Sequence, residues 1–121
     1  MIQCPSIVAM TTSIVKVSSF PYVQDFETEG HGWRPMGSNV SWSLTLPAKS
    51  IAKCISGTKC WVSGGKYGVP NPTEMSWIQS PEFDFTYFIN DPLFSFWVNS
   101  QNVLGTVGIN VQLSTDLGQS W

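Results

Sequence analysis

The feature that most constrains the fold is an alternation of apolar and polar side chains that recurs along the chain. In "VGINVQLS", residues 107–114, the side chains of Val107, Ile109, Val111 and Leu113 alternate with small or polar ones. A period of two places such apolar side chains on one face of a β-strand. The same pattern predicts strands over residues 20–27, 42–46 and 92–100, and strand composition extends to residues 51–55, 59–64, 75–80 and 82–87.

Clusters rich in Gly, Pro, Asn and Ser separate these stretches, for example "TEGHG", "PMGSN" and "SGGKYGVPNPTE". Such clusters are typical of turns, and no window of ten residues shows the 3.6-residue period of a helix. We therefore expect an all-β fold, an antiparallel sandwich of two sheets with jelly-roll (concanavalin-like) or Greek-key connections. Residues 20–121 form this domain. Residues 1–19 are either an added edge strand or a linker from a preceding domain.

Composition excludes several classes of protein. The chain has 121 residues, 42% hydrophobic and 12% charged, which argues against disorder. Six Lys and Arg residues in a chain of net charge −2 provide no basic surface for nucleic acid. The stretch "SIVAMTTSIVKV" is too short and too polar to span a bilayer. No basic segment precedes it, which argues against an intact signal peptide.

The three cysteines lack the spacing of a zinc site, and the only histidine is His31. Cys54 and Cys60 flank "ISGTK", which has the composition of a tight turn. Two readings stay open for this pair. The sequence favours two buried free thiols, and the alternative is a short cross-strand disulfide.

The last eight residues, "STDLGQSW", match the Asp-box pattern Ser-x-Asp-x-Gly-x-Thr/Ser-Trp. Side-chain oxygens of Ser114 and Asp116 accept hydrogen bonds from N–H groups of the loop itself in such a turn. Gly118 supplies the positive φ that the reversal needs. Ser120 completes the pattern, and Trp121 begins the returning strand and covers the turn. The motif predicts a structural hairpin. A sialidase, in which Asp-boxes also recur, would need an arginine cluster that this chain lacks.

Five motifs in a fixed order carry a wider resemblance: "FPYVQDFETEGHGW", "SGTKCWVSGG", "SWIQSPEFDFT", "DPLFSFWVNS" and "VGINVQLSTDLGQSW". In this order they resemble the MAM-like jelly-roll modules of secreted bacterial surface proteins. Reelin subrepeats are similar in placing an Asp-box inside a jelly roll. The resemblance covers residues 20–121. Because such modules continue past the Asp-box for several strands, it implies that this chain is the N-terminal two thirds of one module.

The resemblance has two further implications. These jelly rolls often hold a calcium ion, and the matching acid here is Glu27, with Asp25 beside it. The alternative, that both are solvent-facing strand residues, is the one we favour, so no cofactor is required. A module that ends at the Asp-box also leaves residues 107–114 as an unpaired sheet edge. We expect this edge to support a homodimer.

Other acids and His31 are weak candidates for catalysis. Glu82 and Asp84 alternate with Phe83 and Phe85, so the acids share one face of a strand and the rings share the other. Paired carboxylates can hydrolyse glycosides, but a solvated face is the favoured reading. His31 lies in a glycine-rich turn without a nucleophile beside it.

Aromatic side chains outside the core are the better functional lead. Flat rings beside polar side chains bind sugars in sandwich domains, and the candidates are Trp33, Arg34, Tyr67 and Trp97. The alternative for Trp33, as for Trp42, Trp61 and Trp77, is a place in the core.

These features predict a non-catalytic adhesion or carbohydrate-binding module of a larger secreted or cell-surface protein, with a carbohydrate or a cell-surface protein as partner. One alternative is an accessory fragment of a secreted hydrolase, either a glycosidase or a peptidase. The other is a purely structural protein-interaction module without a small ligand.

Overall fold

A computed structural model describes residues 14–48, 53–100 and 109–121 of the chain. In these residues the regular structure is β, apart from one 3-10 turn, and no α-helix occurs. The all-β prediction is thereby confirmed, whereas the jelly-roll topology stays a prediction. The elements in chain order are β1 (Lys16–Val17), β2 (Arg34–Ser38), β3 (Ser43–Thr45), β4 (Cys60–Val62), η1 (Gly65–Tyr67), β5 (Met75–Gln79) and β6 (Glu82–Phe83).

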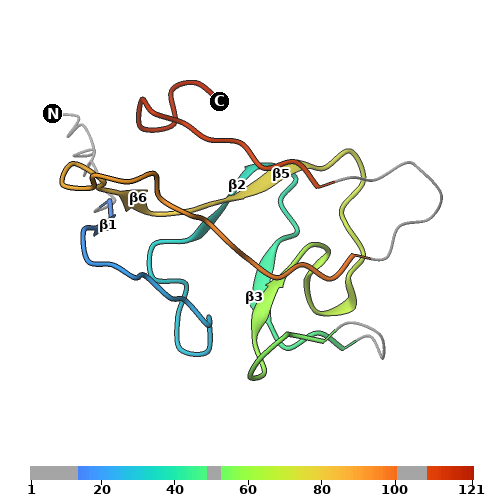
Figure 1. Ribbon diagram of the computed structural model, residues 1–121. Coiled ribbons are helices and arrows are strands. Elements are labelled where there is room, and N and C mark those ends of the chain that lie inside the picture. The colour runs from blue at the N-terminus through green and yellow to red at the C-terminus, as the bar shows by residue number, and fades with distance from the viewer. Residues whose placement is uncertain (1–13, 49–52, 101–108) are drawn as a thin grey trace, which may run out of the picture.

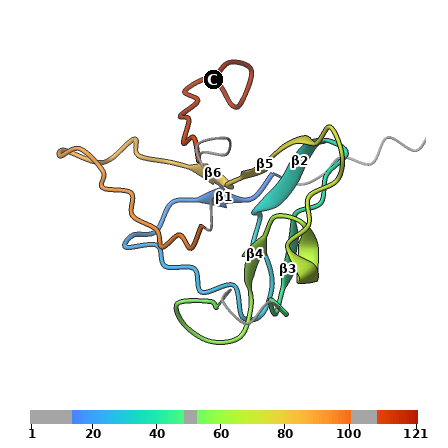
Figure 2. The same cartoon turned by 90° about the vertical axis from the view of Figure 1, so that its right-hand side faces the viewer.

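The strands pair as three two-stranded sheets (Figure 1). The longest ladder joins β2 and β5 in antiparallel register, from Arg34 opposite Gln79 to Ser38 opposite Met75. β3 and β4 form a second antiparallel pair, with Leu44 opposite Trp61. β1 lies parallel to β6, with Lys16 opposite Glu82, and Figure 2 shows these two strands side by side. The parallel pair departs from the wholly antiparallel arrangement that we expected.

Four predicted strands form close to their expected places. β3, β4, β5 and β6 lie inside residues 42–46, 59–64, 75–80 and 82–87. β1 lies inside residues 1–19, where an added edge strand was one of two readings; residues 1–13, including Cys4, are outside the described part.

Other strand predictions are wrong. Residues 20–27 form no strand, because Phe26 has φ 63° and the backbone turns there. Residues 92–100, 53–55 and 109–114 are also assigned to no strand. Residues 51–52 and 107–108 of the predicted strands lie outside the described part. Conversely, β2 occupies the "PMGSN" stretch that composition assigned to a turn. Because β2 pairs with β5 alone, it is an edge strand, and an edge strand tolerates a proline such as Pro35.

Aromatic rings also connect the N-terminal segment to β6 and to the residues that follow it. The ring of Phe20 lies 5.2 Å from that of Phe85 and 4.9 Å from that of Phe88, the latter edge to face. Tyr22 meets Phe83 edge to face at 5.3 Å. Phe83 and Phe85 are stacked at 6.1 Å, so the two rings lie on one side of the chain although β6 ends at Phe83.

A second group of rings joins the first through a hydrogen bond. Phe26 packs edge to face against Trp33 at 5.7 Å and against Trp61 at 6.4 Å. The indole N–H of Trp33 donates to the hydroxyl of Tyr22 at 3.1 Å. Trp61 carries the one buried side-chain polar atom of the described residues that lacks a hydrogen-bond partner, its indole nitrogen.

No apolar side chain of the described residues is fully buried. Trp33, Trp42 and Trp61 are half-buried, whereas Trp77 is exposed, so the core position expected for Trp77 is wrong. In the described part the ring contacts therefore carry a larger share of the cohesion than in a closed sandwich.

We expect Phe20→Ala to destabilise the chain, because one ring supplies contacts to three others. A large-to-small change at a half-buried ring costs about 1 to 3 kcal/mol, less than the cost at a fully buried site. Urea unfolding followed by tryptophan fluorescence measures the change. Tyr87→Ala is the control, since that ring is 94% exposed. Equal midpoints for the two variants would contradict the role of the cluster.

Candidate functional site

The Asp-box forms a turn in which the carboxylate of Asp116 accepts from the following residues. Asp116 Oδ1 accepts from the backbone N–H of Gln119 at 3.0 Å and of Ser120 at 2.9 Å. Its Oδ2 accepts from the Ser120 hydroxyl at 2.5 Å. Ser114 Oγ donates to Asp116 at 2.7 Å and accepts from Gly118 N–H at 2.7 Å. These bonds, that from the Ser120 hydroxyl foremost, lower the pKa of Asp116.

Gly118 has φ 83°, and the turn packs near β5. A Cβ added at Gly118 would lie 3.3 Å from the Trp121 ring and 3.4 Å from the side-chain nitrogen of Gln79. Trp121 is 51% exposed. Both carboxylate oxygens of Asp116 accept hydrogen bonds from within the turn.

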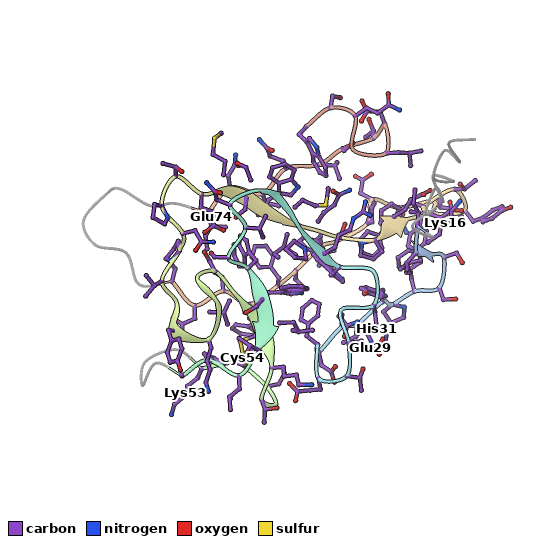
Figure 3. The ribbon with its side chains drawn as sticks, turned by 180° about the vertical axis from the view of Figure 1, so that it is seen from behind. Lys16, Glu29, His31, Lys53, Cys54 and Glu74 are labelled. Atoms are coloured by element: carbon purple, nitrogen blue, oxygen red, sulfur yellow. A yellow bond between two sulfur atoms is a disulfide. The ribbon has the colours of Figure 1, made fainter. Side chains whose placement is uncertain are left out.

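Cys54 and Cys60 are joined in a disulfide that closes a short loop. The favoured reading of two free thiols is therefore wrong. The reason is geometric: their Cα atoms lie 5.6 Å apart, within the usual span of a disulfide. In Figure 3 Cys54 lies beside the β3–β4 pair.

The carboxylate of Glu27 binds this disulfide loop through three hydrogen bonds. Glu27 Oε1 accepts from the backbone N–H groups of Thr58 and Lys59, each at 2.8 Å, and Oε2 accepts from the Thr58 hydroxyl at 2.9 Å. These bonds, led by that from Lys59 N–H, lower the pKa of Glu27. A Cβ at residue 57 would lie 2.3 Å from the carboxylate, so Gly57 is the residue that allows this approach.

The surroundings of Glu27 do not fit the calcium site that the resemblance implied. Three hydrogen-bond donors already engage its carboxylate oxygens. A Ca²⁺ ion, which takes six to eight oxygen ligands, would have to compete with these donors. Asp25 Oδ1 accepts from Glu27 N–H at 3.1 Å, an interaction within the same turn. In the described part of the chain no three His, Cys, Asp or Glu side chains gather closely enough to hold a metal ion.

Glu74 is a second carboxylate that links segments distant in sequence. It accepts hydrogen bonds from the Ser41 N–H at 2.9 Å, from the Asn71 N–H at 3.1 Å, and from the hydroxyls of Ser41 and Ser76. The two hydroxyls are the main cause of a pKa of about 2 for Glu74. Figure 3 shows Glu74 at the end of the β2–β5 pair.

Asn39 and Asn71 close the same junction. The side-chain amide of Asn71 donates to the backbone carbonyl of Asn39 at 2.9 Å. The side-chain amide of Asn39 donates to the hydroxyl of Thr73 at 3.1 Å. The loop after β2 is thus fastened to the loop before β5. No sequence motif announces this junction, because its partners are separated by more than thirty residues.

Glu82 and Asp84 face the same lysine and so lie on one side of the chain, although β6 ends at Phe83. Lys16 Nζ lies 3.0 Å from Asp84 Oδ2 and 3.7 Å from Glu82 Oε1. Asp84 also accepts from the Thr86 hydroxyl at 2.5 Å, and this bond is the first cause of its pKa of about 2. Through their ion pairs with Lys16, the two carboxylates connect β1 to the chain at β6.

Tyr67 lies in a loop whose backbone is hydrogen-bonded and whose aromatic ring is exposed. Gly64 and Gly68 enclose η1 with φ values of 80° and 60°. Backbone bonds join Val69 N–H to Gly64 O at 3.2 Å and Ala48 N–H to Lys66 O at 2.9 Å. The ring of Tyr67 is nevertheless 67% exposed, with Lys66 Nζ 5.8 Å from its centre.

The other sugar-binding candidates lie on other segments of the chain. Trp97 is 79% exposed and lies on the segment of residues 92–100. Trp33 packs in the aromatic group described above. Arg34 lies on β2 opposite Gln79.

A hollow of about 330 Å³ opens near the N-terminal turn, lined by Tyr22, Val23, Gln24, Asp25 and His31. His31 Nε2 lies 2.9 Å from the Thr28 hydroxyl. No cysteine or serine is among the residues that line this hollow.

The strands of the described residues define the class of the protein as all-β. Comparisons with protein-family models, with curated proteins and with solved structures found no match. The resemblance to MAM-like modules therefore stays a prediction based on the order of five motifs. Among the residues that the structure describes, no helix is both long and apolar enough to cross a membrane.

Acid should weaken the fold through Glu74. Its folded pKa of about 2 lies below the ordinary 4.5, so the unfolded chain binds more protons between these values. The stabilisation is complete above about pH 4.5 and is lost as the pH falls towards 2. We expect the urea midpoint of Glu74→Gln to decline less steeply over this range than that of the unmodified chain. Glu29→Gln is the control for removal of one exposed charge, and a decline as shallow in this variant would contradict the assignment.

The disulfide makes a separate prediction about thiol labelling. Cys54 and Cys60 are expected to resist iodoacetamide in urea without reductant and to react fully after reduction. Peptide mass spectrometry reads both states. Labelling of either residue before reduction would show that the bond is not formed in the isolated protein.

Proposed function

We propose that this chain is a non-catalytic jelly-roll module that binds carbohydrate at the surface of a cell, as part of a larger secreted protein. The observation that carries the proposal is the exposed ring of Tyr67 on a backbone fastened by hydrogen bonds. A flat ring held in place presents apolar area to a sugar at little entropic cost. Lys66 supplies a donor for hydroxyl groups beside it.

Trp97 offers a second exposed ring of larger area. Trp33 and Arg34 take no part in the proposed contact, because the first belongs to an aromatic cluster and the second to the β2–β5 ladder. Tyr67 and Trp97 are the two exposed rings of the proposal.

The state of the carboxylates supports a non-catalytic role. A glycosidase acid needs a raised pKa so that it is protonated at neutral pH. Hydrogen bonds lower the pKa of Glu27, Glu74, Asp84 and Asp116 instead. These four acids serve as acceptors that fasten loops and strands.

The Cys54–Cys60 disulfide supports a secreted or cell-surface location. Disulfides persist in oxidising compartments and are rare in the reducing cytosol. A redox role would need an accessible thiol partner, which the closed loop of Cys54 and Cys60 does not itself provide.

A glycan array followed by titration calorimetry tests the proposal. We expect Tyr67→Ala to weaken binding about tenfold, near the upper end of what one aromatic contact contributes. Trp97→Ala reports whether the second ring takes part. Tyr87→Ala is the matched control, an exposed tyrosine on another turn that should bind like the unmodified chain.

Two outcomes would overturn the proposal. Binding to no glycan at all would favour a purely structural interaction module. Hydrolysis of a glycoside or a peptide by the purified chain would favour a fragment of a hydrolase.

A further inference from the structure

The disulfide loop is attached both by a covalent bond and by a carboxylate. The disulfide joins Cys54 to Cys60 and closes the loop on itself. Thr58 and Lys59, which come just before Cys60, donate three hydrogen bonds of 2.8 to 2.9 Å to Glu27. The covalent bond and the carboxylate therefore act on neighbouring residues of one short loop.

The two ends of the loop differ in what else holds them. Cys60 lies in β4 opposite Thr45 of β3, so the antiparallel ladder keeps it in place. Trp61, the next residue of β4, packs edge to face on the ring of Phe26 at 6.4 Å. Cys54 belongs to no strand. Opening the disulfide therefore frees the end of the loop at Cys54, while the end at Cys60 stays in its ladder.

The disulfide lowers the cost of ordering the groups that Glu27 binds. Two backbone N–H groups and one hydroxyl must converge on a single carboxylate, which restricts each residue that carries them. A disulfide between ends six positions apart removes much of that freedom in advance. Coupling of this kind is reciprocal, so the hydrogen bonds to Glu27 also stabilise the disulfide.

An external dithiol has access to this bond. Cys54 and Cys60 are half-buried, and Ile55 and Ser56 beside Cys54 are exposed. One thiolate of the dithiol attacks a sulfur of the disulfide, which releases the first cysteine and forms a mixed disulfide. The second thiol of the dithiol then attacks the mixed disulfide and releases the second cysteine. Two electrons and two protons pass to the cysteines, and the dithiol leaves as its own disulfide.

We propose that the Cys54–Cys60 disulfide and the carboxylate of Glu27 form a redox-sensitive latch. In the oxidised chain the loop is bound to Glu27. Reduction by a dithiol releases the loop from Glu27, while β3 and β4 remain paired. The latch involves neither Tyr67 nor Trp97, so it does not depend on carbohydrate binding.

Amide hydrogen exchange, followed by NMR in the oxidised and the dithiothreitol-reduced chain, tests the release. The N–H groups of Thr58 and Lys59 should be protected in the oxidised chain and should exchange about tenfold faster after reduction, because the open loop leaves the carboxylate more often. The N–H groups of Ser41 and Asn71 are the matched control, since a carboxylate, that of Glu74, binds them as well. Their protection should not change.

Variants test the reciprocal effect on the disulfide. Iodoacetamide labelling and mass spectrometry measure the oxidised fraction at a fixed ratio of reduced to oxidised dithiothreitol. Glu27→Gln should shift this equilibrium about tenfold towards the thiols, because a neutral acceptor makes weaker hydrogen bonds. Thr58→Val removes one hydrogen bond without a change of charge and should shift it about threefold. Glu29→Gln removes an exposed charge nearby and should match the unmodified chain.

Any of four results refutes the latch. Free exchange of the Thr58 and Lys59 N–H groups in the oxidised chain shows that the loop is not bound to Glu27. Protection that survives reduction shows that the binding does not need the disulfide. Loss of protection at Ser41 and Asn71 as well shows that reduction unfolds the chain as a whole. Equal redox equilibria for Glu27→Gln and Glu29→Gln show that the carboxylate and the disulfide are not coupled.

Discussion

Edge-to-face contacts between aromatic rings are the interaction on which the described part of this structure depends. The ladders are short, no apolar side chain is fully buried, and only 12% of the residues are charged. Rings at Phe20 and Tyr22 meet those at Phe83, Phe85 and Phe88, and the bond from Trp33 to Tyr22 extends the contact to Phe26 and Trp61. Aromatic pairs add about 0.5 to 1.5 kcal/mol each beyond their buried area, so a few of them hold segments that sheet pairing leaves apart.

Carboxylates perform a second structural task. Glu27, Glu74 and Asp116 each gather several N–H and hydroxyl donors, most of which belong to loops, while Ser76, one donor to Glu74, lies in β5. An ionised acceptor makes a stronger hydrogen bond than a neutral one. The acids thereby fix loop conformations, and the same bonds keep them ionised and so unsuited to proton transfer.

The sequence predicts local features well and long-range features poorly. The alternation at residues 75–80 and 82–87 located β5 and β6, and the spacing of Ser114, Asp116 and Gly118 predicted a turn whose hydrogen bonds are all local. β2 was missed because Pro35 and Gly37 are turn formers, and its pairing with β5 depends on residues about forty positions away. The partners of Glu27 and Glu74 are hidden for the same reason. Residues 92–100 have the pattern of a strand, but a pattern does not supply the neighbour that a strand requires.

The disulfide loop has a consequence for sequence variation. The disulfide between Cys54 and Cys60 closes the base of the loop. The residues just before Cys60, Thr58 and Lys59, donate hydrogen bonds to Glu27. The tip, at Ile55 and Ser56, is exposed and contributes nothing to either attachment. Exposed tips anchored at both ends tolerate inserted peptides. Diversification of this loop, by evolution or by peptide grafting, can therefore change the recognition properties of the surface without altering the frame that presents it.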